Sequence, residues 1–186
     1  MVNVQDHVRR AERGARIGKA LCMAPGSGEF AMNDVTLREQ QLVALLDTRD
    51  WLTNAAQTCA FIAQQFDALN WVGFYRQRPA NMLVLGPFQG LPACNPIPFE
   101  QGVCGKAART RQTQRVDDVH AVPDHIVCDA ASRSELVVPV IVDDALWGVL
   151  DIDSPSPARF STADQHAIER LCRVFVEASD FEAVAA

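Results

Sequence analysis

The sequence lacks the short paired motifs that hold structural metal ions. Its six cysteines include no CxxC pair, and its four histidines form no HxxxH or HExxH pattern. Structural zinc sites usually take their ligands in close pairs along the chain, so the spacing argues against a zinc ribbon or finger. From these patterns we expect no metal site and no other cofactor.

A long apolar run and an excess of positive charge are also missing. The longest apolar stretch, Leu136–Val142, is far too short to cross a bilayer, and charged residues near the N-terminus occupy the place of a signal-peptide core. The net charge is −6 and the pI about 5.1, whereas a nucleic-acid binder needs a basic surface. We expect a cytoplasmic protein that binds neither nucleic acid nor membrane.

What is present is enough for one domain: 186 residues, of which 48% are hydrophobic. Residues 1–31 differ from the rest, with clustered arginines followed by the flexible segment Pro25–Gly28. A basic amphipathic helix is one interpretation, and a disordered or tag-like extension is the one we favour. The domain is then expected to span residues 32–186.

Hydrophobic periods of three to four residues predict helices, and periods of two predict strands. The expected elements are a helix from Asp34, a helix over Thr53–Phe66, a hairpin of Trp71–Gln77 and Met82–Phe88, a short helix over Gly102–Gln112, a strand over Thr113–Val119, a hairpin of Leu136–Val142 and Leu146–Ile152, and a helix opened by a capping box at Ser161–Asp164. This order predicts an α+β fold in which helices flank a central antiparallel sheet.

The cysteines divide by their setting. Cys59 and Cys172 lie on apolar helical stripes and are expected in the core. Cys94 lies in a proline-rich loop or edge, and Cys128 in a loop. Cys104 falls in the first turn of a short helix, whose N-terminus would favour a thiolate. Cys94, Cys104 and Cys128 are therefore candidates for thiol chemistry.

Acidic and aromatic residues near the strands offer a binding site. Strand alternation sends Asp151 and Asp153 to one face, and Glu135 begins the adjacent strand. Such carboxylates can bind an ammonium group, or raise one another's pKa and deliver a proton. The solvent side of an edge strand is the alternative. Trp71, Phe74 and Tyr75 are interpreted either as an aromatic wall for a sulfur-bearing methyl group or as core residues.

Several blocks of the sequence resemble one enzyme family in the same order. They are Asn70–Tyr75, Leu85–Gly90 with Pro92–Cys94, Gly102–Ala108, His125–Asp129 with Ser132–Glu135, and Gly148–Ser154. Together they closely resemble the free methionine-(R)-sulfoxide reductases, a catalytic branch of the GAF domain fold. The resemblance runs from about Leu37 to the final helix and implies a GAF-like domain.

The resemblance also implies a substrate, free L-methionine-(R)-S-oxide, and a role for each matched cysteine. Cys128 matches the nucleophile that attacks the sulfoxide sulfur and becomes a sulfenic acid. Cys94 matches the cysteine that resolves it to a disulfide, and Cys104 a third cysteine that assists recycling. Thioredoxin is the implied reductant, and the family is commonly homodimeric.

The remaining matches imply the binding site. Glu135, Asp151 and Asp153 match acidic residues that bind the substrate and supply a proton, with Trp71 and Tyr75 along the pocket. Two alternatives stay open. A non-catalytic GAF module could bind a small ligand or sense redox state, and the cysteines could form a structural thiol cluster or an adventitious metal site.

Overall fold

The structure is a computed structural model that describes residues 31–121 and 130–181. The predicted nucleophile Cys128, its neighbour His125 and the predicted extension up to residue 30 lie outside the described residues. Within the described ranges, no helix combines the length and the apolar character that a membrane-spanning segment needs. The predicted role of Cys128 therefore stays a prediction.

An antiparallel sheet in the order β3-β2-β1-β6-β5-β4 organises the domain. Its strands are β1 (Trp71–Arg78), β2 (Met82–Gln89), β3 (Ile97–Pro98), β4 (Gln114–Val116), β5 (Ser134–Val142) and β6 (Ala145–Ser154). Both predicted hairpins, β1–β2 and β5–β6, are confirmed. The hairpins join along β1 and β6, which places these two strands at the centre of the sheet.

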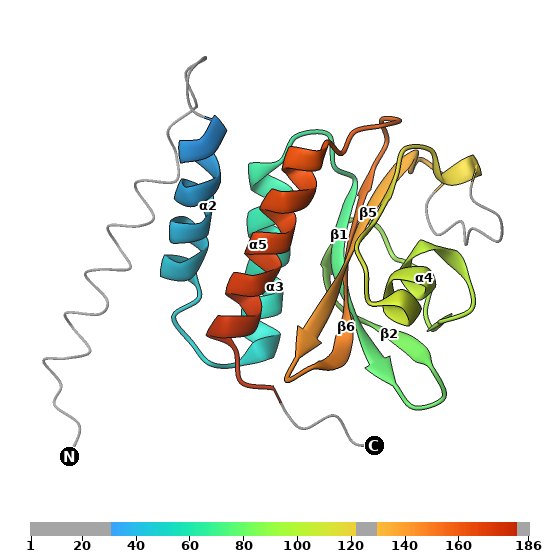
Figure 1. Ribbon diagram of the computed structural model, residues 1–186, viewed down its shortest axis with the longest axis horizontal. Helices are drawn as coiled ribbons and strands as arrows, with labels where there is room; N and C mark the ends of the chain where they lie inside the picture. The colour runs from blue at the N-terminus through green and yellow to red at the C-terminus, as the bar shows by residue number, and fades with distance from the viewer. Residues whose placement is uncertain (1–30, 122–129, 182–186) are drawn as a thin grey trace, which may run out of the picture. The chain divides into compact units, whose positions relative to one another are not determined.

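Helices cover both faces of the sheet. The helices α3 (Trp51–Gln65) and α5 (Thr162–Ala178) pack on one face, α2 (Ala31–Leu45) lies beyond them on the same side, and α4 (Gly102–Thr110) packs on the other face (Figure 1). The α+β architecture of the prediction, with helices flanking an antiparallel sheet, is confirmed. The capping box of α5 is also confirmed: the Ser161 hydroxyl accepts from the Asp164 amide, and the Asp164 carboxylate accepts from the Ser161 amide.

Two predicted boundaries are wrong. The helix α2 is described from Ala31 onward, so Asp34, where the sequence predicted the helix to begin, lies inside it. The strand predicted to end at Val119 ends at Val116. There Asp118 Oδ1 accepts a hydrogen bond from the His120 amide, a local interaction that begins the 3₁₀ turn η1 (Val119–Ala121) instead.

The sheet separates two apolar clusters, because neighbouring strand residues point to opposite faces. The larger cluster lies under α3 and α5, where the rings of Phe74 and Phe175 approach to 4.6 Å between centroids. Of the two interpretations given for Phe74, the core is therefore confirmed and the aromatic wall is wrong. Trp71 and Tyr75 belong to the second cluster, on the α4 face.

Cys59 and Cys172 are core residues of the larger cluster, as predicted. Burial raises the pKa of each thiol to about 12, so both are neutral at physiological pH. Cys59 also donates a hydrogen bond from Sγ to the Pro87 carbonyl. Neither thiol is placed for redox chemistry.

Candidate functional site

The α4 face of the sheet gathers the acidic residues that the sequence singled out. Asp153 of β6 pairs across the sheet with Trp71 of β1 on one side and with Glu135 of β5 on the other. Asp151, two residues earlier on β6, shares their face, whereas Ile152 between them lies in the opposite cluster. The predicted alternation is confirmed. The alternative of an edge strand is wrong, because β6 is a central strand.

The helix α4 brings a thiol to these carboxylates. Cys104 lies in the first turn of α4, as predicted, and is buried. The next residue, Gly105, allows the helix to come this close: a Cβ at this position would lie 2.6 Å from the Phe99 carbonyl oxygen and 2.7 Å from that of Pro98. Only a glycine therefore fits where α4 meets the segment that follows β3.

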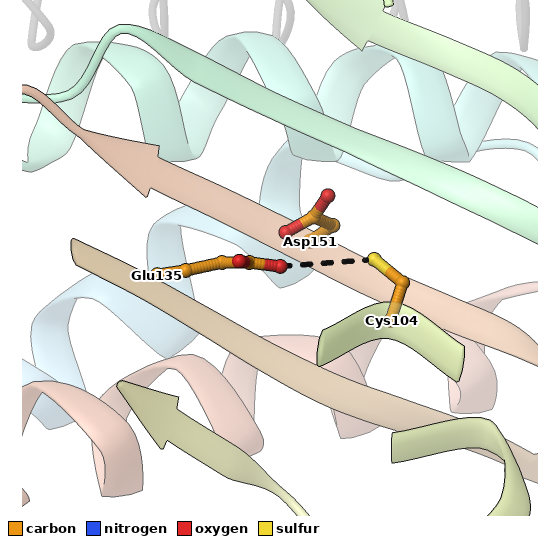
Figure 2. Close-up of side chains that lie close together, drawn as sticks. All are labelled: Cys104, Glu135 and Asp151. Carbon is orange, nitrogen blue, oxygen red and sulfur yellow. Dashed lines mark hydrogen bonds between the residues drawn. The ribbon is translucent and has the colours of Figure 1, made fainter. Parts of the chain in front are cut away.

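Cys104, Glu135 and Asp151 form a compact cluster, which we call the thiol–carboxylate cluster. Their side chains extend from α4, β5 and β6 toward one another (Figure 2). The Cys104 thiol donates to Glu135 Oε1 at 3.9 Å, and one donor atom from each residue lies within 4.8 Å of the other two. All three residues are buried.

Burial separates the proton affinities of the two carboxyl groups. Loss of solvent, followed by the charge of Asp151, raises the pKa of Glu135 well above its ordinary value. Burial also raises the pKa of Asp151, but only to about 6, because hydrogen bonds with Cys104 and Glu135 favour its charged form. At neutral pH Glu135 therefore keeps its proton and Asp151 is ionised. One carboxyl can donate a proton while its neighbour attracts a cation.

The predicted thiolate at Cys104 is wrong. Burial, then the charges of Asp151 and Glu135, raises the pKa of this thiol well above its ordinary value. A helix N-terminus is worth at most about 2 kcal/mol to an anion, whereas full burial beside like charges shifts a pKa by several units. Cys104 is accordingly a neutral hydrogen-bond donor in the structure.

The thiol–carboxylate cluster lines an open pocket of about 560 Å³, part of which is open to solvent. The pocket wall also contains Asp153, Trp71 and Tyr75. The rings of Trp71 and Tyr75 stack at 5.7 Å between centroids. Trp71 folds over its own strand, since a Cβ at Gly73 would lie 2.2 Å from the indole ring. The site therefore joins an acidic floor to an aromatic wall, which suits a small cation with an apolar side chain.

The segment that carries Cys94 is held over this wall. Tyr75 donates from its hydroxyl to the Cys94 carbonyl at 3.2 Å, and the Trp71 indole donates to the Leu91 carbonyl at 3.0 Å. Cys94 is partly buried on this loop, and its neighbour Ala93 lines the pocket. The described structure thus brings the carboxylates, Cys104 and the aromatic residues into one pocket, with Cys94 at its rim.

Ser132 is a pocket residue that the sequence reasoning did not assign. It is buried, and its hydroxyl accepts a hydrogen bond from the Asn70 amide at 3.0 Å. A hydroxyl in the wall can bind a polar group of the ligand. The available signal was its position just before the strand that carries Glu135, inside one of the blocks noted above.

Comparisons with known proteins give a consistent assignment. The GAF domain model matches residues 36–178. The free methionine-R-sulfoxide reductase of Escherichia coli is 46% identical over 65% of this chain and 73% of its own length; that of Saccharomyces cerevisiae is 37% identical over 81% and 90%. An X-ray structure of the free methionine-R-sulfoxide reductase of Neisseria meningitidis in complex with its substrate is 38% identical, with a TM-score of 0.77 over 84% of this chain and 94% of that one.

Proposed function

Because the chain belongs to the GAF family, and within it to the free methionine-R-sulfoxide reductases, we propose that it reduces free L-methionine-(R)-S-oxide to L-methionine. The observation that carries this proposal is the pairing of protonated Glu135 with ionised Asp151 at the floor of an aromatic-lined pocket. Sulfoxide reduction needs a proton for the departing oxygen, and recognition of a free amino acid needs an anion for its ammonium group.

In the proposed binding mode, Asp151 and Asp153 receive the substrate ammonium group. The side chain then runs along the wall of Trp71 and Tyr75, against which its methyl group packs. Glu135 holds its proton near the sulfoxide oxygen. This arrangement favours a free amino acid as substrate, since a methionine within a peptide has no ammonium group to offer the acidic floor.

The proposed chemistry uses Cys128 as the nucleophile. Its thiolate attacks the sulfoxide sulfur while Glu135 protonates the oxygen; methionine leaves and the oxygen stays on Cys128 as a sulfenic acid. The Cys94 thiol then attacks that sulfur, which releases water and forms a disulfide. A dithiol reductant, for which we propose thioredoxin, restores both thiols. Each cycle transfers two electrons from the reductant to the sulfoxide.

Cys94 is better suited than Cys104 to the first resolving step. Cys94 lies on a loop at the rim of the pocket, whereas Cys104 is buried and its raised pKa keeps it protonated. We assign Cys104 an assisting role in recycling. Mass spectrometry of the disulfide trapped after one turnover identifies the pair: a Cys94–Cys128 bond supports this order, and a Cys104–Cys128 bond contradicts it.

A coupled assay tests the function. The protein is mixed with thioredoxin, thioredoxin reductase and NADPH, and each epimer of free methionine sulfoxide is added separately. Oxidation of NADPH is expected with the R epimer and not with the S epimer or with peptide-bound sulfoxide. The variant Cys128→Ser is expected to be inactive, and Cys172→Ser, whose thiol lies in the opposite core, is the matched control. Ligand binding without turnover by folded protein would support the non-catalytic GAF alternative instead.

Three further proposals concern the setting of this activity. Residues 32–186 form the catalytic domain, which the match to residues 36–178 supports; a chain without residues 1–31 should keep full activity. The protein forms a homodimer, which light scattering during gel filtration measures directly. We place it in the cytoplasm, where a reducing environment keeps such thiols free.

A further inference from the structure

The thiol–carboxylate cluster brings together three atoms that could bind a metal ion, which its proposed catalytic role does not fully explain. One sulfur and two carboxylate oxygens lie within 4.8 Å of one another, on residues that are all buried. The residues come from α4, β5 and β6, and Cys104 and Glu135 are 31 positions apart. Sequence spacing therefore showed no metal motif, because the donors meet only in the folded chain.

The separation of the donors fits a tetrahedral metal ion of the zinc class. Such an ion lies about 2.3 Å from a thiolate sulfur and about 2.1 Å from a carboxylate oxygen, so a tetrahedral angle places the two donors about 3.6 Å apart. The Cys104 sulfur and Glu135 Oε1 are 3.9 Å apart. The three donor atoms all lie within 4.8 Å of one another, so side-chain movements of about 1 Å bring them to the bound geometry.

A second observation points to a cation at this place. Asp151 is only 6% exposed, and the hydrogen bonds that it makes with Cys104 and Glu135 leave one of its two oxygens, Oδ1, without a partner among the described residues. A buried carboxylate oxygen without a partner costs free energy that a bound cation offsets. Asp151 also lines the open pocket, so a hydrated ion has a path to it.

The donor types select the class of ion. Calcium and magnesium prefer oxygen ligands alone, so a thiol among the three donors disfavours both ions. A mixed sulfur and oxygen set of three suits Zn²⁺ or Co²⁺, with the fourth position left for water from the pocket or for the nearby Asp153 carboxylate.

We propose that Cys104, Glu135 and Asp151 bind a thiophilic divalent cation of the Zn²⁺ class in this pocket, and that the bound ion excludes the substrate. Binding forms one metal–sulfur and two metal–oxygen bonds, and the protons of Cys104 and Glu135 go to solvent. No electron is transferred. The ion is therefore a reversible inhibitor that occupies the place of the substrate ammonium group. The exclusion of substrate rests on the proposed function, whereas the metal site itself does not.

Cobalt spectroscopy tests the site without any measurement of activity. Co²⁺ is titrated into the full-length, reduced protein, and we expect a thiolate-to-cobalt charge-transfer band that saturates at one ion per chain and is lost on addition of Zn²⁺. The band should disappear in Cys104→Ser and persist in Cys94→Ser and Cys172→Ser. It should also persist in Cys128→Ser. A band that survives in Cys104→Ser, or is lost in Cys128→Ser, overturns the assignment.

The variant Asp151→Asn covers the case in which Cys104→Ser fails to fold. It keeps the shape of the side chain and removes one ligand, so calorimetry should show Zn²⁺ affinity lowered by at least about tenfold. Unchanged affinity in folded Asp151→Asn contradicts the proposed ligand set.

Inhibition kinetics test the exclusion of substrate. Zn²⁺ should raise KM for the free sulfoxide without lowering kcat, and a chelator should reverse the effect. Activity that is insensitive to Zn²⁺ at concentrations that saturate the cobalt-defined site refutes the exclusion. An inactive protein that still shows the cobalt band refutes the proposed function and leaves the metal site standing.

Discussion

Replacing Asp151 by asparagine is expected to stabilise the folded protein at neutral pH while it removes activity. Asp151 is buried beside Glu135, and the loss of solvent raises its pKa from 3.8 to about 6. A carboxyl group whose pKa is higher in the folded state than in the unfolded state stabilises the fold only while it is protonated. That contribution is complete below the unfolded pKa and is lost as the pH rises through the folded value. Asparagine keeps the shape of the side chain and never ionises.

The size of the effect follows from the two pKa values. With a value of 3.8 in the unfolded chain and about 6 in the folded one, ionisation of Asp151 costs about 1.6 kcal/mol of stability at pH 5 and about 3 kcal/mol at pH 8. The variant should therefore gain about 1.4 kcal/mol more at pH 8 than at pH 5.

Urea denaturation at pH 5 and at pH 8, in the presence of a chelator, measures this difference. The midpoint of the variant should exceed that of the wild type at both values, with the larger gain at pH 8 and with unchanged slopes. An equal gain in stability at the two pH values, or a variant less stable than the wild type at pH 8, would refute the idea that the buried charge of Asp151 destabilises the fold. A stable but inactive variant is the trade-off expected of a functional site.

Three further changes test neighbouring parts of the site. In the wild type, kcat should fall at alkaline pH as Glu135 loses its proton, above the usual carboxyl range. Glu135→Gln should lower kcat by about 10²–10⁴-fold and remove this alkaline decrease. An unaltered pH profile in the variant would exclude Glu135 as the acid. Tyr75→Phe removes the hydrogen bond to the Cys94 carbonyl and should cost about 1 kcal/mol in urea denaturation and slow disulfide formation after the first turnover, whereas an unchanged rate argues against an anchoring role. Gly105→Ala should cost about 1–3 kcal/mol, because its Cβ meets two carbonyl oxygens; a midpoint equal to that of the wild type contradicts the close approach of α4.

The parts of the site that sequence could predict are those fixed by local geometry. Alternation along a strand is a property of the backbone, so Asp151 and Asp153 could be placed together on one face and Ile152 on the other. The same rule places Phe74 opposite Tyr75, and its consistent use would have removed Phe74 from the aromatic wall. The capping box at Ser161 is likewise a local pattern.

The parts that depend on how elements dock could not be predicted. The contact of Cys104 with Glu135 requires α4 to pack closely on the sheet face. Gly105 allows this close approach, but the neighbours that make a glycine necessary there are brought together only by folding. The protonated states of Cys104 and Glu135 also depend on this packing of α4, because it buries both groups. A helix N-terminus can be recognised in the sequence and favours a thiolate. Burial and nearby carboxylates reverse this preference at Cys104, and both arise only from the tertiary structure.

One measurement tests the central claim directly: methionine released in a single turnover by the reduced protein without added reductant. With the free R epimer we predict about one equivalent of methionine per chain, because the disulfide then stops the cycle. The S epimer and the variant Cys128→Ser should release none. Methionine from Cys128→Ser, or none from the folded wild-type protein with the R epimer, would contradict the account.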